Sequence, residues 1–221
     1  MLPAMTADIH ERTGKGPDWS YDAVFYHVLV DRFRRGGDAS LLGDPAEPVF
    51  CGGNLAEVTD SLDYLRDLGI TALWLSPINC TAAYHGYHVT DYEDKVHVAH
   101  PAGEPSIEIA QALLNAHHAK FPAKCVLPAF LDNHDMNRFL YEAKNKKERL
   151  RLGAQLQFRQ KHPPIIYYGT EVGLSQSRPI VGPYGDLAAR QMMPWKNQDK
   201  ALLAFFVDLI HQRRGRYPSR L

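Results

Sequence analysis

Residues 54–77, which read NLAEVTDSLDYLRDLGITALWLSP, decide the fold. Asn54 is a good N-cap and Glu57 follows it three positions later, as at the start of many helices. Leucines and a valine then repeat at spacings of three and four, which predicts one helix with a single apolar face. Gly69 suits the position just after the C-terminus of that helix. The apolar run 71–75 follows at once and predicts a buried strand, so this stretch is typical of a parallel α/β sheet.

The same alternation of helix and strand continues on both sides of this stretch. An earlier run, 23–30, is almost continuously apolar and predicts another strand buried on both faces. Later segments predict, in order, a helix over 106–120, a strand over 125–131, a helix over 146–158, a strand over 163–169 and a helix over 199–213. Residues 173–198 are rich in glycine and proline and predict a long loop.

Composition limits the class of protein. The chain has 221 residues, of which 45% are hydrophobic, and this length favours one packed domain or at most two small ones. Its 25 basic and 25 acidic side chains balance, so we expect no nucleic-acid partner and no membrane partner. No apolar run is long enough for a transmembrane helix, and no secretory leader is visible at the start. Cys51, Cys80 and Cys125 form no CxxC pair, which is typical of reduced thiols, so we expect a cytoplasmic protein.

Polar and aromatic residues gather just after three of the predicted strands. These clusters are YHGYHVTDY at 84–92, DNHDMNR at 132–138 and GTE at 169–171. In parallel α/β folds, functional residues collect at the carboxyl ends of strands. Aromatic rings beside carboxylates and imidazoles suit a sugar, since rings stack on its C–H faces and carboxylates bind its hydroxyl groups.

Other interpretations of these residues stay open at this point. His85, His88, His134 and Asp135 could ligate a metal, but their spacing matches no standard zinc pattern, so we expect no metal and no cofactor. Asn133 and Asp135 could cap the following helix, and the tyrosines could be packing residues. Glu171 could be a structural hydrogen-bond partner.

Several segments in the right order resemble one known family, glycoside hydrolase family 13, the α-amylase family. The resemblance is strongest to its neopullulanase, cyclomaltodextrinase and amylase-like members, and it covers about residues 19–92 and 120–214. The segments that carry it are FYHV at 25–28 with DRF at 31–33, GGNL at 52–55, LDYLRDLGI at 62–70, 71–77, YHGY at 84–87 with TDY at 90–92, FLDNHD at 130–135, 163–174, Arg190 and MPW at 193–195.

The resemblance implies part of a (β/α)₈ TIM barrel. The matched strands are similar to barrel strands seven, eight, one and two, so the expected fold is a parallel sheet with flanking helices. Positions 93–129 are too few for strands three to six, because a complete barrel needs about 250 residues. We therefore expect a loose arm over 1–20 and an incomplete barrel domain over 21–221, with the junction of an internal deletion at about 93–119. Residues 95–98 could add one short strand.

The resemblance also implies roles for five residues. Asp135 corresponds to the family's carboxylate that stabilises the transition state, and His134 to the histidine that bonds to the same sugar. Tyr87 stacks under that ring with His85 beside it, and Arg138 orients carboxylates. The resemblance thus implies that His134, Tyr87, His85 and Arg138 bind the substrate. The nucleophilic aspartate and the general-acid glutamate belong to the missing stretch, whereas retaining hydrolysis needs both. Glu104 and Glu108 at the junction are conceivable replacements that nothing else supports.

These residues predict an α-amylase-family homologue for α-glucan and maltooligosaccharide substrates, with impaired catalysis. The alternatives are a non-catalytic α-glucan-binding remnant and a truncated product without function. A half barrel exposes two strand edges and parts of its inner face, for which we expect Phe25, Leu73 and Ile165. We therefore expect two copies to associate as a homodimer.

Overall fold

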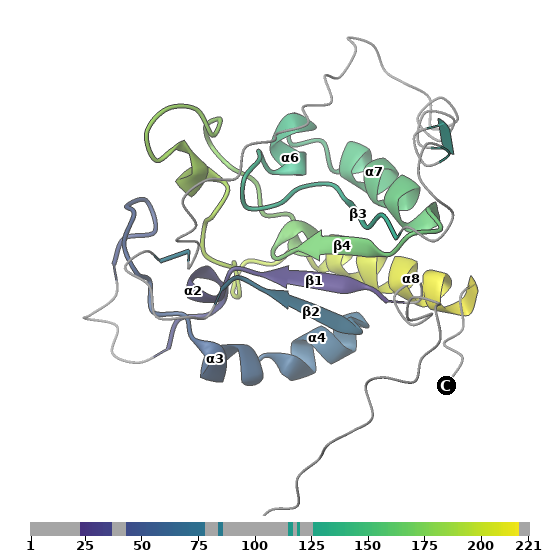
Figure 1. The fold of residues 1–221 in the computed structure, drawn as a ribbon, viewed down its shortest axis with the longest axis horizontal. Helices are drawn as coiled ribbons and strands as arrows, with labels where there is room; N and C mark the ends of the chain where they lie inside the picture. Colours follow the sequence, from purple (N-terminus) through teal and green to yellow (C-terminus); the bar gives the residue numbers. More distant parts are fainter. Residues whose placement is uncertain are drawn as a thin grey trace, which may run out of the picture.

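The computed structural model describes residues 23–36, 43–77, 84–85, 115–116, 119 and 126–216. Its centre is a sheet of four parallel strands in the order β2-β1-β4-β3 (Figure 1). The strands are β1 (Phe25–Val28), β2 (Ala72–Leu75), β3 (Ala129–Phe130) and β4 (Pro164–Tyr167). Strands that are distant in sequence are therefore neighbours, since β4 pairs with β1. This order confirms the predicted partial barrel, in which strands seven, eight, one and two lie side by side.

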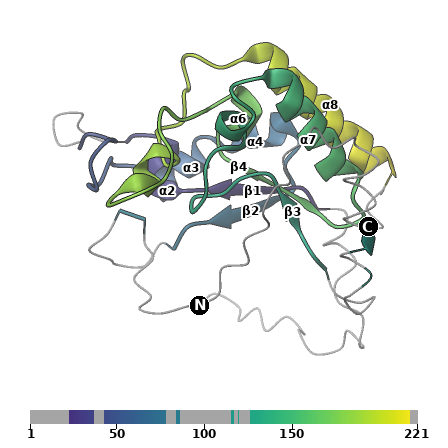
Figure 2. The same cartoon turned by 90° about the horizontal axis from the view of Figure 1, so that it is seen from above.

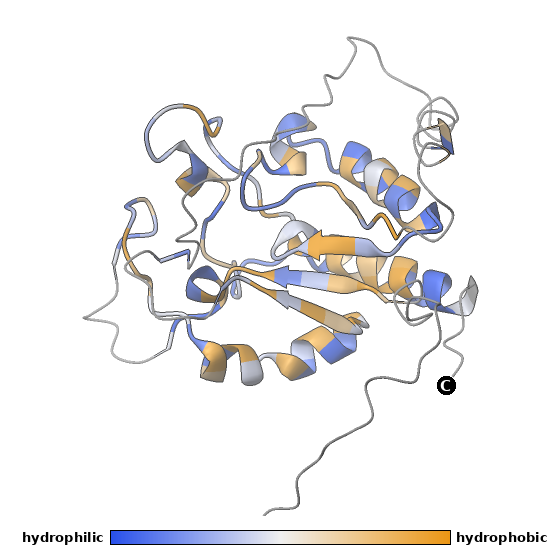
Figure 3. Ribbon diagram, viewed as in Figure 1, coloured by the Kyte–Doolittle hydropathy of each residue, from blue (hydrophilic) through white to orange (hydrophobic). Residues whose placement is uncertain are grey.

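Helices lie on one face of this sheet (Figure 2). The helices and 3₁₀ turns are α2 (Val30–Phe33), α3 (Leu55–Thr59), α4 (Leu62–Leu68), α6 (Phe139–Glu142), α7 (Lys147–Arg159), η2 (Thr170–Val172), η3 (Gly185–Ala188) and α8 (Lys200–Arg216). β4 and the middle of α8 are coloured as hydrophobic, whereas β1 is hydrophilic towards its carboxyl end (Figure 3). Tyr26, Leu68, Ile166, Leu202 and Phe206 belong to the buried core between these layers. Burial of such side chains is the main favourable term in folding.

The predicted helix over 54–68 is two helices, and this part of the prediction was wrong. Asn54 caps α3 as expected, because its side chain accepts a hydrogen bond from the Glu57 amide. The break comes at Ser61, whose buried hydroxyl donates to the Glu57 carbonyl and accepts from Arg34. Such a local hydroxyl bond competes with the helical ladder. Gly69 then ends α4 in the left-handed region, with φ of 96°, as predicted.

The first predicted strand is also shorter than expected. β1 ends at Val28, and the chain turns into α2 from Val30. The Val30 amide donates to the side chain of Ser76, just after β2, rather than continuing the ladder. Pro128 lies directly before β3, which agrees with the tolerance of proline at the start of a strand.

Register decides which side chains face away from the helices. Trp74 pairs with His27, whereas Leu73 pairs with Tyr26, whose side chain points into the core beneath the helices. Because paired residues share a face, Trp74 and not Leu73 lies on the inner face with Phe25. Leu73 is nonetheless 38% exposed at the edge strand, and Trp74 is 46% exposed. Ile165 is buried, so the expectation that it is exposed was wrong.

Some predicted segments lie outside the described residues. These are the arm over 1–20, the short strand over 95–98, and the helix over 106–120 except for positions 115, 116 and 119. Among the helices that the structure describes, none has both the length and the apolar character needed to cross a membrane. Cys51 is buried with a free thiol, and the other two cysteines lie outside the described residues.

Candidate functional site

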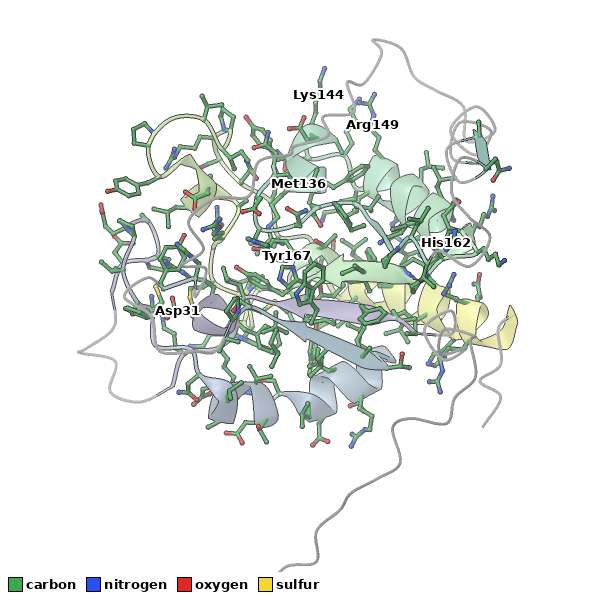
Figure 4. The ribbon with its side chains drawn as sticks, in the orientation of Figure 1. Asp31, Met136, Lys144, Arg149, His162 and Tyr167 are labelled. Carbon is green, nitrogen blue, oxygen red and sulfur yellow. The ribbon has the colours of Figure 1, made fainter. Side chains whose placement is uncertain are left out.

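The candidate site lies where the strands end. Tyr167 is at the carboxyl end of β4, and Met136 belongs to the loop that follows β3 at this same edge (Figure 4). His162 precedes β4 and lies at the opposite, amino end of the strands. The described parts of the loops after β2, β3 and β4 thus meet at the carboxyl end of the sheet, as parallel strand order requires.

Asp135 carries an exposed carboxylate at the carboxyl end of the sheet. Its Oδ2 lies 3.1 Å from Nε2 of His134, and its Oδ1 accepts from Nη2 of Arg190 at 2.9 Å. The side chain is still 64% exposed, so a ligand can reach it. The hydrogen bond with His134, supported by the Arg190 charge, lowers the pKa of Asp135 to about 2. Asp135 is therefore an ionised carboxylate held on two sides.

Arg190 is the residue that joins the loops. Its Nε donates to the His134 carbonyl at 2.8 Å, its Nη1 donates to Oη of Tyr84 at 2.9 Å, and the same Nη1 pairs with Asp186. Arg190 itself is 7% exposed. One buried guanidinium therefore fixes the loop after β3 to Tyr84 and to η3, and its planar fork suits the two carboxylates.

A second arginine supports the other side of Tyr84. Cζ of Arg32 lies 4.3 Å from the centre of the Tyr84 ring. Arg32 pairs with Asp31 at 3.2 Å and donates to the Val49 carbonyl at 3.0 Å. The Asp31 carboxylate accepts from the amide of Cys51 at 2.9 Å. This network ties the loop over 43–50 to the end of β1, so that two loops flank the site.

Aromatic rings form the floor beneath His134. His27 is stacked on Trp74, with ring centres 4.7 Å apart, and it meets His134 edge-on at 5.1 Å. Tyr167 lies on its other side at 5.2 Å. His27 is 1% exposed, and burial lowers its pKa to about 3, so its ring is neutral at physiological pH. A neutral imidazole can pack there without the cost of a buried charge.

Arg138 occupies a different place from the one that its predicted role suggests. It is fully buried, and it donates to the carbonyls of Tyr168 at 2.6 Å and Ala189 at 2.8 Å. Its guanidinium lies 3.9 Å from the centre of the Tyr167 ring. The substrate-binding role of Arg138 stays a prediction, whereas these contacts join the loops after β3 and β4.

The interpretation that Asn133 and Asp135 cap the following helix was wrong. Asp132, not Asp135, accepts from the first amide of α6, that of Phe139, at 2.9 Å. Asn133 accepts from the Asp135 amide at 2.8 Å and thereby closes a local turn. Asp135 is left free of capping, and its oxygens point to His134 and Arg190.

Glu171 is a structural hydrogen-bond partner, as one interpretation held. It is fully buried, and its Oε1 accepts from the hydroxyl groups of Tyr26 at 2.8 Å and Tyr64 at 2.6 Å. Desolvation raises the pKa of Glu171. These contacts place it among the packed helices rather than at the exposed edge.

The remaining predicted residues are only partly described. His85 is half-buried beside the Tyr84 ring, at 5.1 Å between ring centres. Tyr87, His88, Glu104 and Glu108 lie outside the described residues. Among the side chains that are described, no three His, Cys, Asp or Glu residues gather as ligands for a metal ion.

Sequence reasoning missed the contributions of Arg190 and His27. Arg190 stood out only as part of a family segment, and its partners are 55 and 106 positions away. No local pattern encodes such pairs. The sequence gives a weak indication of His27, because a histidine near the carboxyl end of an apolar strand lies at the same end of the sheet as the clusters that follow the other strands.

Comparison with known proteins explains this arrangement. The catalytic-domain model of the α-amylase family matches residues 27–100 and 99–208. Cyclomaltodextrinase of Geobacillus thermopakistaniensis is 41% identical over 86 residues, which cover 35% of this chain and 15% of that protein. Alpha-amylase 3 of Dictyoglomus thermophilum is 39% identical over 107 residues, which cover 48% of this chain and 18% of that protein. The chain thus spans less than a fifth of the length of these relatives.

Solved structures of other proteins share the fold. Cyclic α-maltosyl-(1→6)-maltose hydrolase from Arthrobacter globiformis, in complex with that sugar, aligns with a TM-score of 0.72 at 18% identity. The alignment covers 93% of this chain and 85% of that one. A cyclomaltodextrinase aligns with a TM-score of 0.70 at 18% identity, covering 91% of this chain and 64% of that one. With the family model matching most of its length, the chain belongs to the α-amylase family, glycoside hydrolase family 13.

Proposed function

We propose that this chain binds α-glucan oligosaccharides at Asp135 and hydrolyses them slowly or not at all. The observation that carries the proposal is the state of Asp135, which is ionised, exposed and fixed by His134 and Arg190. Such a carboxylate can accept hydrogen bonds from two sugar hydroxyl groups with little further loss of side-chain entropy, because it is already oriented. The names of the relatives support an α-glucan as the ligand, because they include cyclomaltodextrinase and α-amylase.

Impaired hydrolysis follows from the carboxylates near this residue. Retaining hydrolysis needs a nucleophile and a protonated acid about 5–5.5 Å apart. Asp135 has a pKa of about 2 and is thus no proton donor at neutral pH. Asp132 and Glu171 are buried, and each already accepts two hydrogen bonds from protein groups. Asp186 pairs with Arg190. Among the described residues, the carboxyl groups near Asp135 are therefore either buried or paired with Arg190, and none is placed to donate a proton to a bound sugar.

The test measures binding and turnover on the same samples. Calorimetric titration with maltoheptaose should show binding by the wild-type chain, and Asp135→Asn should weaken it at least tenfold. The matched control is Asp63→Asn, because Asp63 lies on the outer helix α4 and is 82% exposed. Absence of binding by the folded wild-type chain would overturn the proposal.

Reducing-sugar release tests the statement about hydrolysis. The wild-type rate should equal that of Asp135→Asn. A wild-type rate far above the variant's would mean that an acid pair is present and that the chain is an active hydrolase.

We also propose that two copies of the chain associate through the open edges of the sheet. Both edge strands carry exposed rings, since Trp74 on β2 is 46% exposed and Phe130 on β3 is 47% exposed. Within the part of the chain that the structure describes, β2 and β3 are the edge strands, and parallel edges of this kind favour pairing with another chain. A second copy brings a β3 edge for each β2 edge, because all four strands run the same way. Analytical ultracentrifugation at micromolar concentration should show a dimer that Trp74→Lys weakens, and a monomer in the wild-type protein would contradict it.

A further inference from the structure

Tyr184 lies in the loop after β4, at the carboxyl end of the sheet, and combines two unusual properties. Its side chain is 62% exposed, and its φ of 55° lies in the left-handed region that bulky side chains rarely adopt. The other described non-glycine residues with positive φ are Lys144 and Asn145, in the turn between α6 and α7. Asparagine is common in such turns, whereas an aromatic residue is not.

The surrounding loop holds Tyr184 in this conformation. The Gly185 amide donates to the Gly182 carbonyl at 3.1 Å, and a side chain at Gly185 would come within 2.6 Å of the Ile180 backbone. The Tyr184 carbonyl accepts from the Leu187 amide at 3.3 Å, which starts η3. The loop is therefore closed on itself, and the strained residue is fixed with its ring in solvent. Strain that is kept in this way points to function when it lies beside a site.

Tyr184 is connected to Asp135 through a short path. Two residues after Tyr184, the Asp186 carboxylate pairs with Arg190, and Arg190 also holds Asp135. Two residues of chain span at most about 7 Å, and the Asp186 carboxylate and the Arg190 guanidinium make up the rest of the path to Asp135. The Tyr184 backbone therefore lies within the length of an oligosaccharide such as maltoheptaose held at Asp135. In Figure 1, this loop, drawn in light green, lies at the end of the sheet to which the strand arrows point.

We propose that Tyr184 stacks on a sugar unit beyond the two units nearest Asp135, so that the site prefers longer α-glucans to disaccharides. This inference rests on the proposed function. An exposed ring offers a flat apolar face to the C–H groups of a glucose unit, and its hydroxyl group stays in water. Because φ and the closed loop fix the backbone, little entropy is lost on binding.

The experiment compares maltose with maltoheptaose by calorimetric titration. Tyr184→Ala should weaken maltoheptaose binding about threefold to tenfold and leave maltose binding unchanged. Tyr184→Phe should bind as wild type does, because the ring is kept. The matched control is Val181→Ala, since Val181 is 75% exposed in the same loop but has no ring. Equal maltoheptaose affinity in wild type and Tyr184→Ala would overturn the inference.

A second variant separates stacking from folding. Tyr184→Asn suits the left-handed conformation, so it should be at least as stable to heat as wild type and should still lose maltoheptaose affinity. If Tyr184→Asn keeps wild-type affinity, the inference fails even though the proposed function stands. If the wild-type chain binds neither sugar, both fail together.

Discussion

Arg190 donates from Nη2 to Oδ1 of Asp135 at 2.9 Å, across 55 positions of sequence. This bond and the contact from His134 keep the carboxylate ionised. Arg190→Gln should therefore raise the pKa of Asp135 above about 2. The rise should be partial, because the hydrogen bond from His134 is the largest cause of the lowered pKa. Titration of the Asp135 carboxyl carbon by NMR measures it, with Arg66→Gln on the exposed face of α4 as the control. An unchanged pKa would show that Arg190 contributes only packing.

Burial of His27 predicts a loss of stability in acid. Its pKa in the folded state is about 3 against about 6.5 in the unfolded chain, so between these values the unfolded state binds more protons. Stability should thus fall as the pH drops below about 6.5, by about 2 kcal/mol from this group at pH 5. Urea unfolding at pH 7 and pH 5 should show a smaller loss in His27→Phe than in wild type. His211→Gln, on the exposed side of α8, should keep the wild-type loss.

Glu171 predicts a contrast between two substitutions. Both phenol groups donate to Oε1, so the amide oxygen of Glu171→Gln can accept both bonds, and the amide carries no charge at any pH. This variant should be as stable as wild type at pH 7 or more so. Glu171→Ala removes the hydrogen-bond acceptor of the buried Tyr26 hydroxyl and of the partly buried Tyr64 hydroxyl, and it should cost about 1–3 kcal/mol for each.

The pH dependence of unfolding checks the same group. Because the pKa of Glu171 is raised in the folded state, its contribution is fully present below its unfolded pKa and is lost as the pH rises through its folded value. Glu171→Gln should remove that part of the pH dependence. If the two curves run parallel, the carboxyl is already protonated throughout the range or ionised without cost.

Two glycines with positive φ predict different costs for the same change. Gly69→Ala places a Cβ 2.8 Å from Cγ2 of Ile210 on α8, whereas nothing lies within 4 Å of a Cβ at Gly182. Both variants lose about 1 kcal/mol from the left-handed backbone. Gly69→Ala should lose more because α4 and α8 must separate. Urea unfolding of both variants tests this, and equal losses would show that Ile210 moves aside freely.

Much of this fold could be predicted from local patterns, and much of the site could not. The spacing of the leucines and the residues Asn54 and Gly69 are local features, and they predict α4 and the position of β2. The expectation that this strand is buried was wrong, because Leu73 and Trp74 are exposed on β2. The break at Ser61 depends on a bond from Arg34, 27 positions earlier, so helical periodicity alone misses it. The polar clusters after the strands correctly indicated the carboxyl end of the sheet as the place of the site. The partners of Asp135 at that end depend on which loops meet, and only the folded chain decides this.

The long reach of Arg190 has a consequence for how the chain folds. Its bonds close loops of 55 and 106 residues, to Asp135 and to Tyr84. Contacts so distant in sequence form late and slow the search, because the loop entropy is lost before the bond is gained. The binding site is thus expected to be the last region to become ordered. A sugar that binds only the completed site stabilises the native state by mass action. The change in protein fluorescence on sugar binding, or the heat of binding, would therefore report complete folding of the chain.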